Sequence, residues 1–255
     1  MALQIGSALE EAGYRLFSRT GAILFGAFLA LMCGIQALSN TILAITYARL
    51  GYGELASMIP LTLDISLNVA GAGIAVSSVV SLYLTIVSFR TFVGDARDSF
   101  PAGAFTRNVP LAMVNVIVGG IVYGLLVFIG SVLLLIPGIF AYVAFIFMMP
   151  YIVAEDRNFV AALKQSYRLT EGDRVGMFVL LCIVVAVGTL LGGIVGFVGS
   201  LALPGPASLL PTVVIQPLIS LYSTAVIAVA FEQLRERDGT PPSALSEDDT
   251  SMAAL

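Results

Sequence analysis

Four polar side chains stand out because they lie at or within long apolar segments, where a polar group could bind a ligand. They are Asp64, Asn68, Asn115 and Gln216. An ionisable group at membrane depth is costly to bury and is often functional, although we expect Asp64 at the outer edge of its segment, within reach of water. A single carboxylate is not an acid–base pair, and amides do not titrate. These residues are therefore weak candidates for a binding site, whose ligand the sequence leaves unknown, and they predict no proton relay.

Histidine, which many catalytic and metal sites use, is absent from the chain, and cysteine is scarce. The 255-residue chain has no His and only two Cys, Cys33 and Cys182, both within apolar segments. Without His there is no imidazole base, and two Cys alone form neither a metal site nor a disulfide framework. No phosphate-binding glycine loop or serine-nucleophile motif appears. We expect no cofactor, no metal and no catalytic residue, so the sequence predicts a protein that is not an enzyme.

Composition indicates a membrane protein. Hydrophobic residues make up 58% of the chain and charged residues 11%, whereas soluble domains have about 25% charged residues. The predicted fold class is an all-α, polytopic membrane protein. We expect membrane lipids to be its partners. Lys164 is the only lysine among the twelve basic residues, and the net charge is −4. That balance is typical of a halophilic archaeon, and it leaves no basic stripe for a nucleic acid.

Six apolar segments are candidate transmembrane helices, and two shorter segments are candidate interfacial helices. The six are approximately 21–47, 65–89, 111–136, 139–154, 175–203 and 211–231. The fourth is short for a bilayer that needs about 20 residues. Pro137-Gly138 predicts a tight turn between the third and fourth segments. Segments 3–18 and 158–170 have apolar faces at helical spacing but cannot span, so we predict two interfacial amphipathic helices.

The charged residues predict the topology. Eleven of the twelve basic residues fall on one side of the six segments, and Arg49 alone falls on the other. The positive-inside rule places the eleven, and with them both termini, in the cytoplasm. We expect a multi-pass protein of the plasma membrane. Between residues 155 and 174 four acidic residues balance four basic ones, and this predicts a solvated face.

Glycines in the fifth apolar segment predict close helix packing. Gly188, Gly192 and Gly196 recur every four residues, a glycine zipper, and Gly120 with Gly124 in the third segment is a plausible partner. Small residues let membrane helices approach closely. Packing within one chain is the favoured interpretation, and a homo-oligomer formed through the fifth segment is the alternative.

The chain predicts one integral membrane domain over residues 1–235, followed by a disordered acidic tail over 236–255. Tyr14-Arg15-Leu16 and Tyr167-Arg168-Leu169 form a weak internal echo. It suggests repeat modules at 3–89 and 158–231 that flank the hairpin 111–154.

The second half of the chain carries a resemblance to a known family. Its motifs are Leu135-Ile136-Pro137-Gly138-Ile139, then Met149-Pro150, Ala162-Leu163-Lys164-Gln165-Ser166 and Glu171-Gly172. They resemble the membrane domain associated with some glycerophosphodiester phosphodiesterases and its stand-alone haloarchaeal relatives. In that family the activity belongs to a separate soluble barrel domain. The resemblance therefore implies the membrane part alone, without catalysis.

The sequence leaves three functional hypotheses, of which the weakest is a membrane enzyme acting on lipids, because such enzymes usually need clustered carboxylates, His or a metal and none is evident. The first is a non-enzymatic membrane protein with an accessory, scaffolding or lipid-interacting role. The second is a small transporter or channel, which titratable groups at mid-membrane depth would favour. The sequence offers almost none of these groups, so the first hypothesis is preferred.

Labelling with a membrane-impermeant thiol reagent tests the topology. In a background that lacks Cys33 and Cys182, the variants Ser99→Cys and Ser246→Cys should react only after cell lysis, because the basic residues hold these segments in the cytoplasm. A Ser57→Cys variant, on the opposite side, should react in intact cells. Labelling of Ser99→Cys or Ser246→Cys from outside would reject the topology.

Overall fold

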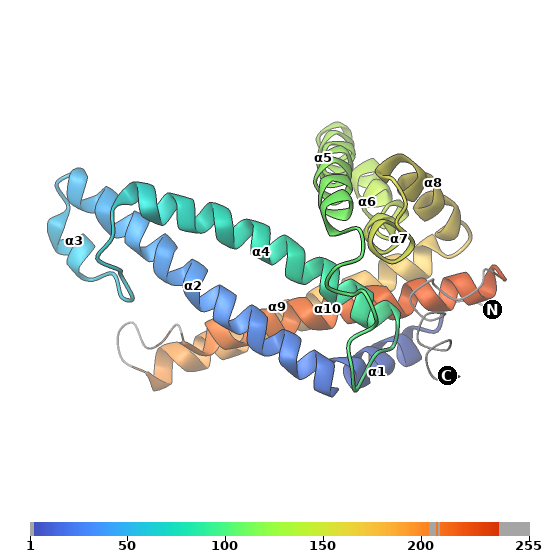
Figure 1. Cartoon of the computed structure of the whole chain (residues 1–255), viewed down its shortest axis with the longest axis horizontal. Coiled ribbons are helices and arrows are strands. Elements are labelled where there is room, and N and C mark those ends of the chain that lie inside the picture. Colours follow the sequence, from blue (N-terminus) through green and yellow to red (C-terminus); the bar gives the residue numbers. More distant parts are fainter. Residues whose placement is uncertain (1–2, 204–207, 209, 240–255) are drawn as a thin grey trace. The chain divides into compact units, whose positions relative to one another are not determined.

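Figure 1 shows the computed structural model of the chain, which describes residues 3–203, 208 and 210–239. All regular elements in these residues are helices. The long ones are α2 (Arg19–Arg49), α4 (Leu67–Val93), α5 (Val109–Leu133), α9 (Arg174–Ala202) and α10 (Leu210–Arg237). The short ones are α1 (Ile5–Leu16), α3 (Gly53–Ser57), α6 (Leu135–Ala144), α7 (Met148–Glu155) and α8 (Phe159–Leu169).

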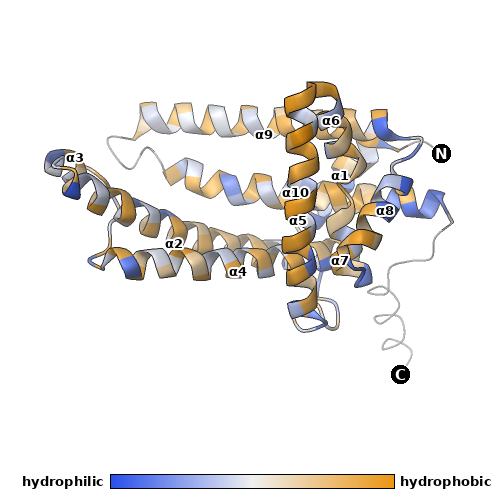
Figure 2. Cartoon of the chain, turned by 90° about the horizontal axis from the view of Figure 1, so that it is seen from above, coloured by the Kyte–Doolittle hydropathy of each residue, from blue (hydrophilic) through white to orange (hydrophobic). Residues whose placement is uncertain are grey.

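The predicted fold class is confirmed. Six helical segments are long and apolar enough to cross a membrane, with α6 and α7 counted as one segment. Figure 2 shows how hydrophobic α5 is along its length. Its exposed side chains include Phe128 and Val132, which are 65% and 69% exposed. Such a surface is stable only in contact with lipid or another protein.

The described residues divide into two compact units. The first takes its residues from 1–22, 85–186 and 221–255, and the second from 23–84 and 187–220. Helices α2, α4, α9 and α10 each contribute one part to each unit. The candidate repeat modules 3–89 and 158–231 therefore do not correspond to the two units, since each module supplies residues to both.

In the second unit, polar side chains of α2 fix the segment that follows α3. The Asn40 amide donates a hydrogen bond to the Pro60 carbonyl oxygen at 2.8 Å. The Thr41 hydroxyl accepts one from the Leu63 backbone N–H, also at 2.8 Å. Both side chains are buried. A buried polar group is costly unless it is hydrogen-bonded, so these bonds hold the segment against α2.

The glycines of α9 lie against α10 in the second unit. A Cβ atom placed on Gly188 would come within 2.9 Å of Ile219 Cγ2, and one on Gly196 within 3.6 Å of Thr212 Oγ1. At Gly192 the nearest atom is Ile219 Cδ1 at 3.9 Å, which is ordinary van der Waals contact. The close approach is thus greatest at Gly188, where the neighbour is Ile219 of α10.

In the first unit, the turn of the α5–α6 hairpin lies earlier than the sequence predicts. Leu134, with an extended backbone, is the single residue between the two helices, and Pro137-Gly138 belongs to the first turn of α6. Proline is tolerated in the first turn of a helix because no helical acceptor is available there for its missing N–H. A Cβ on Gly138 would come within 2.7 Å of the Ser131 backbone nitrogen. The glycine therefore permits close contact between the two helices.

The expected fourth transmembrane segment consists of two helices. Between α6 and α7 the chain turns at residues 145–147, and Ser166 of α8 stabilises this turn. Its hydroxyl accepts a hydrogen bond from the Phe147 backbone N–H at 3.1 Å and donates one to the Ala144 carbonyl oxygen at 2.9 Å. Ser166 is fully buried. One side chain thus satisfies the two backbone groups that the break between the helices exposes.

Helix α10 is longer than the sequence predicts. Helix α10 extends to Arg237, so Glu232 to Arg237 continue the helix that the sequence places as far as residue 231. The predicted disordered tail, 236–255, is therefore wrong for Glu236 and Arg237, which belong to α10, and its residues from 240 onward lie outside the described residues.

The Gly188→Leu substitution should destabilise the folded monomer. The larger side chain would overlap Ile219, and overpacking of this kind costs about 1–3 kcal/mol. For a chain of this size each kcal/mol corresponds to about 2–4 °C, so the melting temperature in detergent should fall by several degrees. Gly192→Ala, where a methyl group has room, should change it little.

Gly124→Leu is the matched control, because a Cβ on Gly124 meets no atom within 4 Å. It should leave the monomer unchanged. If Gly188→Leu instead abolished a dimer and left the monomer equally stable, the glycines would form an interface between two chains, and the packing described here would be rejected.

Candidate functional site

The four polar residues singled out from the sequence do not form one site. Asp64, Asn68 and Gln216 are exposed in the second unit, and their side chains form no hydrogen bond or ion pair with the described residues. Asn115 lies in the first unit and has a structural role. Its amide donates to the Leu111 carbonyl oxygen at 2.9 Å and accepts from the Phe159 N–H at 3.1 Å. It therefore joins α5 to the start of α8.

Two polar residues of the first apolar segment were not among the candidates. Gln36 donates from its amide to Asn40 Oδ1 at 2.8 Å, and Asn40 in turn donates to Pro60. Their spacing of four residues on a helix is the signal that could have identified this pair. The pair stabilises the loop after α3, because Asn40 is hydrogen-bonded to Pro60 of that loop.

Several charged residues of the first unit form ion pairs with distant segments of the chain. Arg15 of α1 is 7% exposed. Its Nη2 lies 2.6 Å from Glu232 Oε2 of α10, and its Nε lies 3.1 Å from Glu11 and 3.3 Å from Asp95. Burial alone lowers the pKa of Arg15, but the hydrogen bond and charge of Glu232, with Asp95 and Glu11, raise it above its ordinary value. Arg15 therefore stays charged and fastens α1 to α10.

Arg90, near the end of α4, has no exposed surface. Its Nε donates to the Val153 carbonyl oxygen at 2.8 Å and its Nη1 to the Ala104 carbonyl oxygen at 3.2 Å. Its Nη2 lies 3.8 Å from Asp156, which also forms a 2.7 Å ion pair with Arg107. A buried guanidinium is stable only when its donors and its charge are matched. Arg90 therefore links α4, the α4–α5 connection and the end of α7.

The end of α10 supplies two more such arginines. Arg235 is 7% exposed, and its Nη1 lies 2.8 Å from Glu155 of α7. Its guanidinium carbon also lies 5.3 Å from the centroid of the Phe231 ring. Arg237 forms an ion pair with Asp173, just before α9. The expectation of a solvated face over residues 155–174 is therefore wrong for Glu155, Asp156 and Asp173, because arginines from other segments pair with them.

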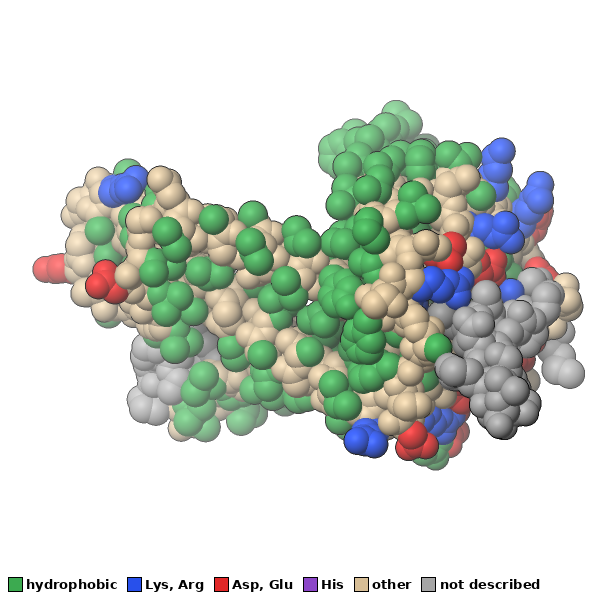
Figure 3. Space-filling model, in the orientation of Figure 1, with side chains coloured by type: hydrophobic (Ala, Val, Ile, Leu, Met, Phe, Trp, Pro, Cys, Tyr) green, Lys and Arg blue, Asp and Glu red, His purple; other side chains and the backbone are tan. Residues whose placement is uncertain are grey.

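Helix α8 differs from α1 and from the end of α10, because its basic residues are exposed on the surface. Lys164 and Arg168 are exposed, and Figure 3 shows charged side chains over α8 and hydrophobic ones over α5. Arg168 occupies the place in the internal echo that Arg15 holds in α1, yet only Arg15 is buried. The leucines that follow them are buried in both cases, Leu16 at 5% and Leu169 at 3% exposure. The two related segments therefore share a buried leucine, but only the first of them forms ion pairs through its arginine.

A polar groove of about 380 Å³ lies between α1 and the end of α10. Carboxylates of Glu10, Glu11, Glu232 and Glu236 line it together with Arg15. Their partners are mostly supplied by the protein itself. Glu11 and Glu232 pair with Arg15, and Glu10 accepts a hydrogen bond from Tyr14 at 3.3 Å. We interpret this groove as part of the α1–α10 contact.

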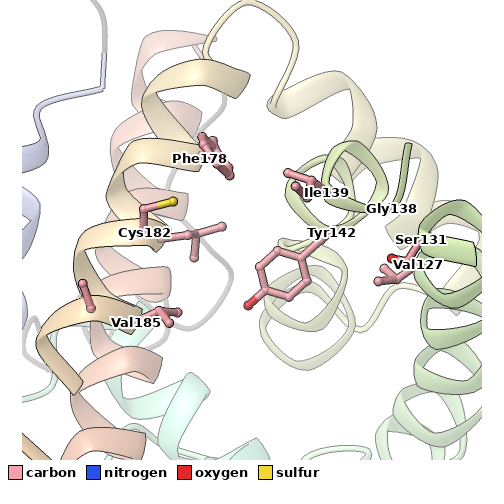
Figure 4. Close-up of a pocket in the computed structure, with 10 residues that line it drawn as sticks. Val127, Ser131, Gly138, Ile139, Tyr142, Phe178, Cys182 and Val185 are labelled. Carbon is pink, nitrogen blue, oxygen red and sulfur yellow. The ribbon is translucent and has the colours of Figure 1, made fainter. Parts of the chain in front are cut away.

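An apolar cavity of about 400 Å³ lies between α5, α6 and α9, and we call it the α5–α6–α9 cavity. Its lining residues are Val127, Ser131, Gly138, Ile139, Tyr142, Phe178, Leu181, Cys182, Val185 and Ala186. Figure 4 shows Phe178, Cys182 and Val185 of α9 facing the α5 and α6 residues across the open space. The Tyr142 ring projects into that space with its hydroxyl group leading.

The cavity walls carry almost no reactive chemistry. Ser131, Tyr142 and Cys182 supply a hydroxyl, a phenol and a thiol, and the walls include no carboxylate or basic group. The volume is in the range of small-molecule sites, which span about 300–1,000 Å³. Within residues 3–203, 208 and 210–239, no group of three acidic or thiol side chains could hold a metal ion. The arrangement can bind an apolar group and orient it through Tyr142.

These features define an all-helical, multi-pass membrane protein whose buried arginines join its helices to each other. The chain belongs to a family described as a domain of unknown function, DUF7847, whose model matches residues 3–234. No curated protein and no solved structure matches the chain.

The Arg90→Gln substitution should destabilise the protein strongly. It removes the charge that faces Asp156 and the donors to two buried carbonyl oxygens, and breaking a buried pair costs about 3–5 kcal/mol. At about 2–4 °C per kcal/mol, the melting temperature in detergent should fall by roughly 10 °C.

Arg97→Gln is the control for Arg90→Gln. Arg97 pairs with Asp95 at 2.8 Å, but its side chain is 42% exposed. Exposed pairs contribute at most about 1 kcal/mol, so this variant should melt within a few degrees of the parent. Equal melting temperatures for the two variants would mean that Arg90 is not a structural link.

Proposed function

We propose that the chain is a non-enzymatic integral membrane protein of the plasma membrane, with an accessory or scaffolding role that includes binding of membrane lipids. The observation that carries the proposal is the chemistry of the α5–α6–α9 cavity. Its walls are apolar and its polar groups are limited to Ser131, Tyr142 and Cys182. An acyl chain fits such walls, whereas an ion or a polar metabolite does not.

The ion pairs support the non-enzymatic part of the proposal. Arg15, Arg90 and Arg235 are buried and bound to carboxylates and carbonyl oxygens of the same chain. Charged groups committed to one another hold a structure rigid and leave little free for acid–base work. A rigid cytoplasmic side suits a protein that positions other components.

The resemblance to the membrane domain associated with glycerophosphodiester phosphodiesterases supports the same proposal. In that family the membrane part accompanies a separate catalytic domain. An accessory role agrees with that arrangement, and both termini in the cytoplasm would place partners there.

Purification from native membranes, followed by lipid analysis and partner identification, tests the proposal. The protein should retain lipid at a fixed ratio through mild detergent and gel filtration. A second sample, in which Tyr142→Trp fills the cavity, should retain less lipid and still elute at the same volume. Protein that carries no lipid or stoichiometric partner, but conducts a solute in proteoliposomes, would reject the proposal in favour of a small transporter or channel.

A further inference from the structure

A second apolar space adjoins the α5–α6–α9 cavity. This groove, of about 300 Å³, lies between α6 and the start of α9, and we call it the α6–α9 groove. Ile136, Ile139 and Val143 of α6 face Val175 and Phe178 of α9 across it. Ile139 and Phe178 also line the cavity, so the two spaces share a wall. Together they form one apolar path along α9.

The path has a single charged residue in its walls, Arg174, the first residue of α9. The Arg174 guanidinium is held between two rings, with its central carbon 4.8 Å from the Phe140 centroid and 4.3 Å from the Tyr167 centroid. Stacking of this kind fixes the plane of the guanidinium and leaves its edge available for bidentate contacts.

Arg174 differs from the structural arginines because the described residues give it no carboxylate. Its Nη2 donates weakly to the Tyr167 carbonyl oxygen at 3.4 Å, and its Nε is buried without a hydrogen-bond partner. The neighbouring Asp173 pairs with Arg237 instead. A partly buried cation beside apolar side chains carries an unfavourable free energy unless an anion binds to it. The surroundings of Arg174 therefore favour binding of an anion.

The dimensions of the path match one leaflet. Arg174, Phe178, Cys182 and Val185 follow one face of α9. At 1.5 Å per residue, the distance from Arg174 to Val185 is roughly 17 Å along the helix. Half of a hydrocarbon core of ~30 Å is about the same length. A molecule with an anionic head at Arg174 and an acyl chain along the path would therefore lie in the orientation of a membrane lipid.

We propose that Arg174 and the apolar path along α6 and α9 form a binding site for an anionic phospholipid. The lipid phosphate is held by the guanidinium, and one acyl chain fills the α6–α9 groove and the adjoining cavity. Phosphate oxygens match the fork of an arginine, which makes this head group the natural partner of a stacked guanidinium. The site rests on the lipid-binding part of the proposed function and assigns it a head group, a residue and a location.

Native mass spectrometry of the delipidated protein tests the proposal, with phosphatidylglycerol and phosphatidylcholine as probes. The parent protein should bind phosphatidylglycerol at least tenfold more tightly than phosphatidylcholine. Arg174→Gln should lose that preference, and Arg174→Lys, which keeps the charge but cannot contact a phosphate in the same bidentate way, should fall between. Ile139→Trp, which fills the shared wall, should weaken binding of both lipids.

Arg168→Gln is the matched control, since Arg168 is an exposed arginine of α8 outside the path. It should bind both lipids as the parent does. Melting curves of the lipid-free variants establish that they are folded; if Arg174→Gln proves unfolded, Arg174→Lys and Ile139→Trp carry the test.

Each other outcome overturns the inference in a distinct way. Equal binding of the two lipids, or binding that Arg174→Gln leaves unchanged, would reject the anionic site while the proposed lipid-binding function stands. No retained lipid in the parent protein would reject both. Displacement of phosphatidylglycerol by millimolar inorganic phosphate would identify free phosphate as the ligand and reject the lipid.

Discussion

Buried arginines are the constraint on which the first unit depends. A guanidinium cannot be left in an apolar interior without partners, because the loss of water costs several kcal/mol. Arg15, Arg90 and Arg235 are each less than 9% exposed, and each has a carboxylate from another segment. Satisfying them requires α1, the end of α4, α7 and the end of α10 to meet. The ion pairs thereby specify which helices are neighbours, a role that apolar contacts alone fulfil poorly when lipid is equally apolar.

The contrast between these arginines and Arg174 shows how one residue type serves two purposes. The structural arginines are matched by carboxylates within the chain, whereas Arg174 is held by aromatic rings and has no carboxylate partner among the described residues. An arginine that is oriented but not neutralised is prepared for a ligand. A charge matched inside the protein contributes to the fold, and a charge left unmatched at the edge of an apolar path contributes to recognition.

The sequence was sufficient to predict where the helices lie along the chain, but not which residues of different helices contact each other. Long apolar runs are local signals, so all six membrane segments could be located, with their ends within four residues except for the end of α10 at Arg237. The predicted position of the turn between α5 and α6 was wrong, because a Pro-Gly pair is typical of a turn. Proline is equally common in the first turn of a helix, and Pro137 lies in the first turn of α6. The pairing of Arg15 with Glu232 could not be predicted, since 217 positions separate them and nothing local marks either residue. The same holds for Ser166, whose hydroxyl completes a break in a different helix.

The long separations between paired residues also have a consequence for how the protein is made. Arg90 donates to a carbonyl oxygen 63 positions later, and Arg15 reaches a carboxylate 217 positions later. At about 5–20 residues per second, synthesis leaves Arg90 without that acceptor for roughly 3–13 seconds and Arg15 without Glu232 for roughly 11–43 seconds. During that interval the ends of the early helices must remain hydrated at the membrane surface. The final burial of Arg90 waits for α7, and that of Arg15 waits for α10, so Arg15 reaches its folded environment only after α10 has been synthesised.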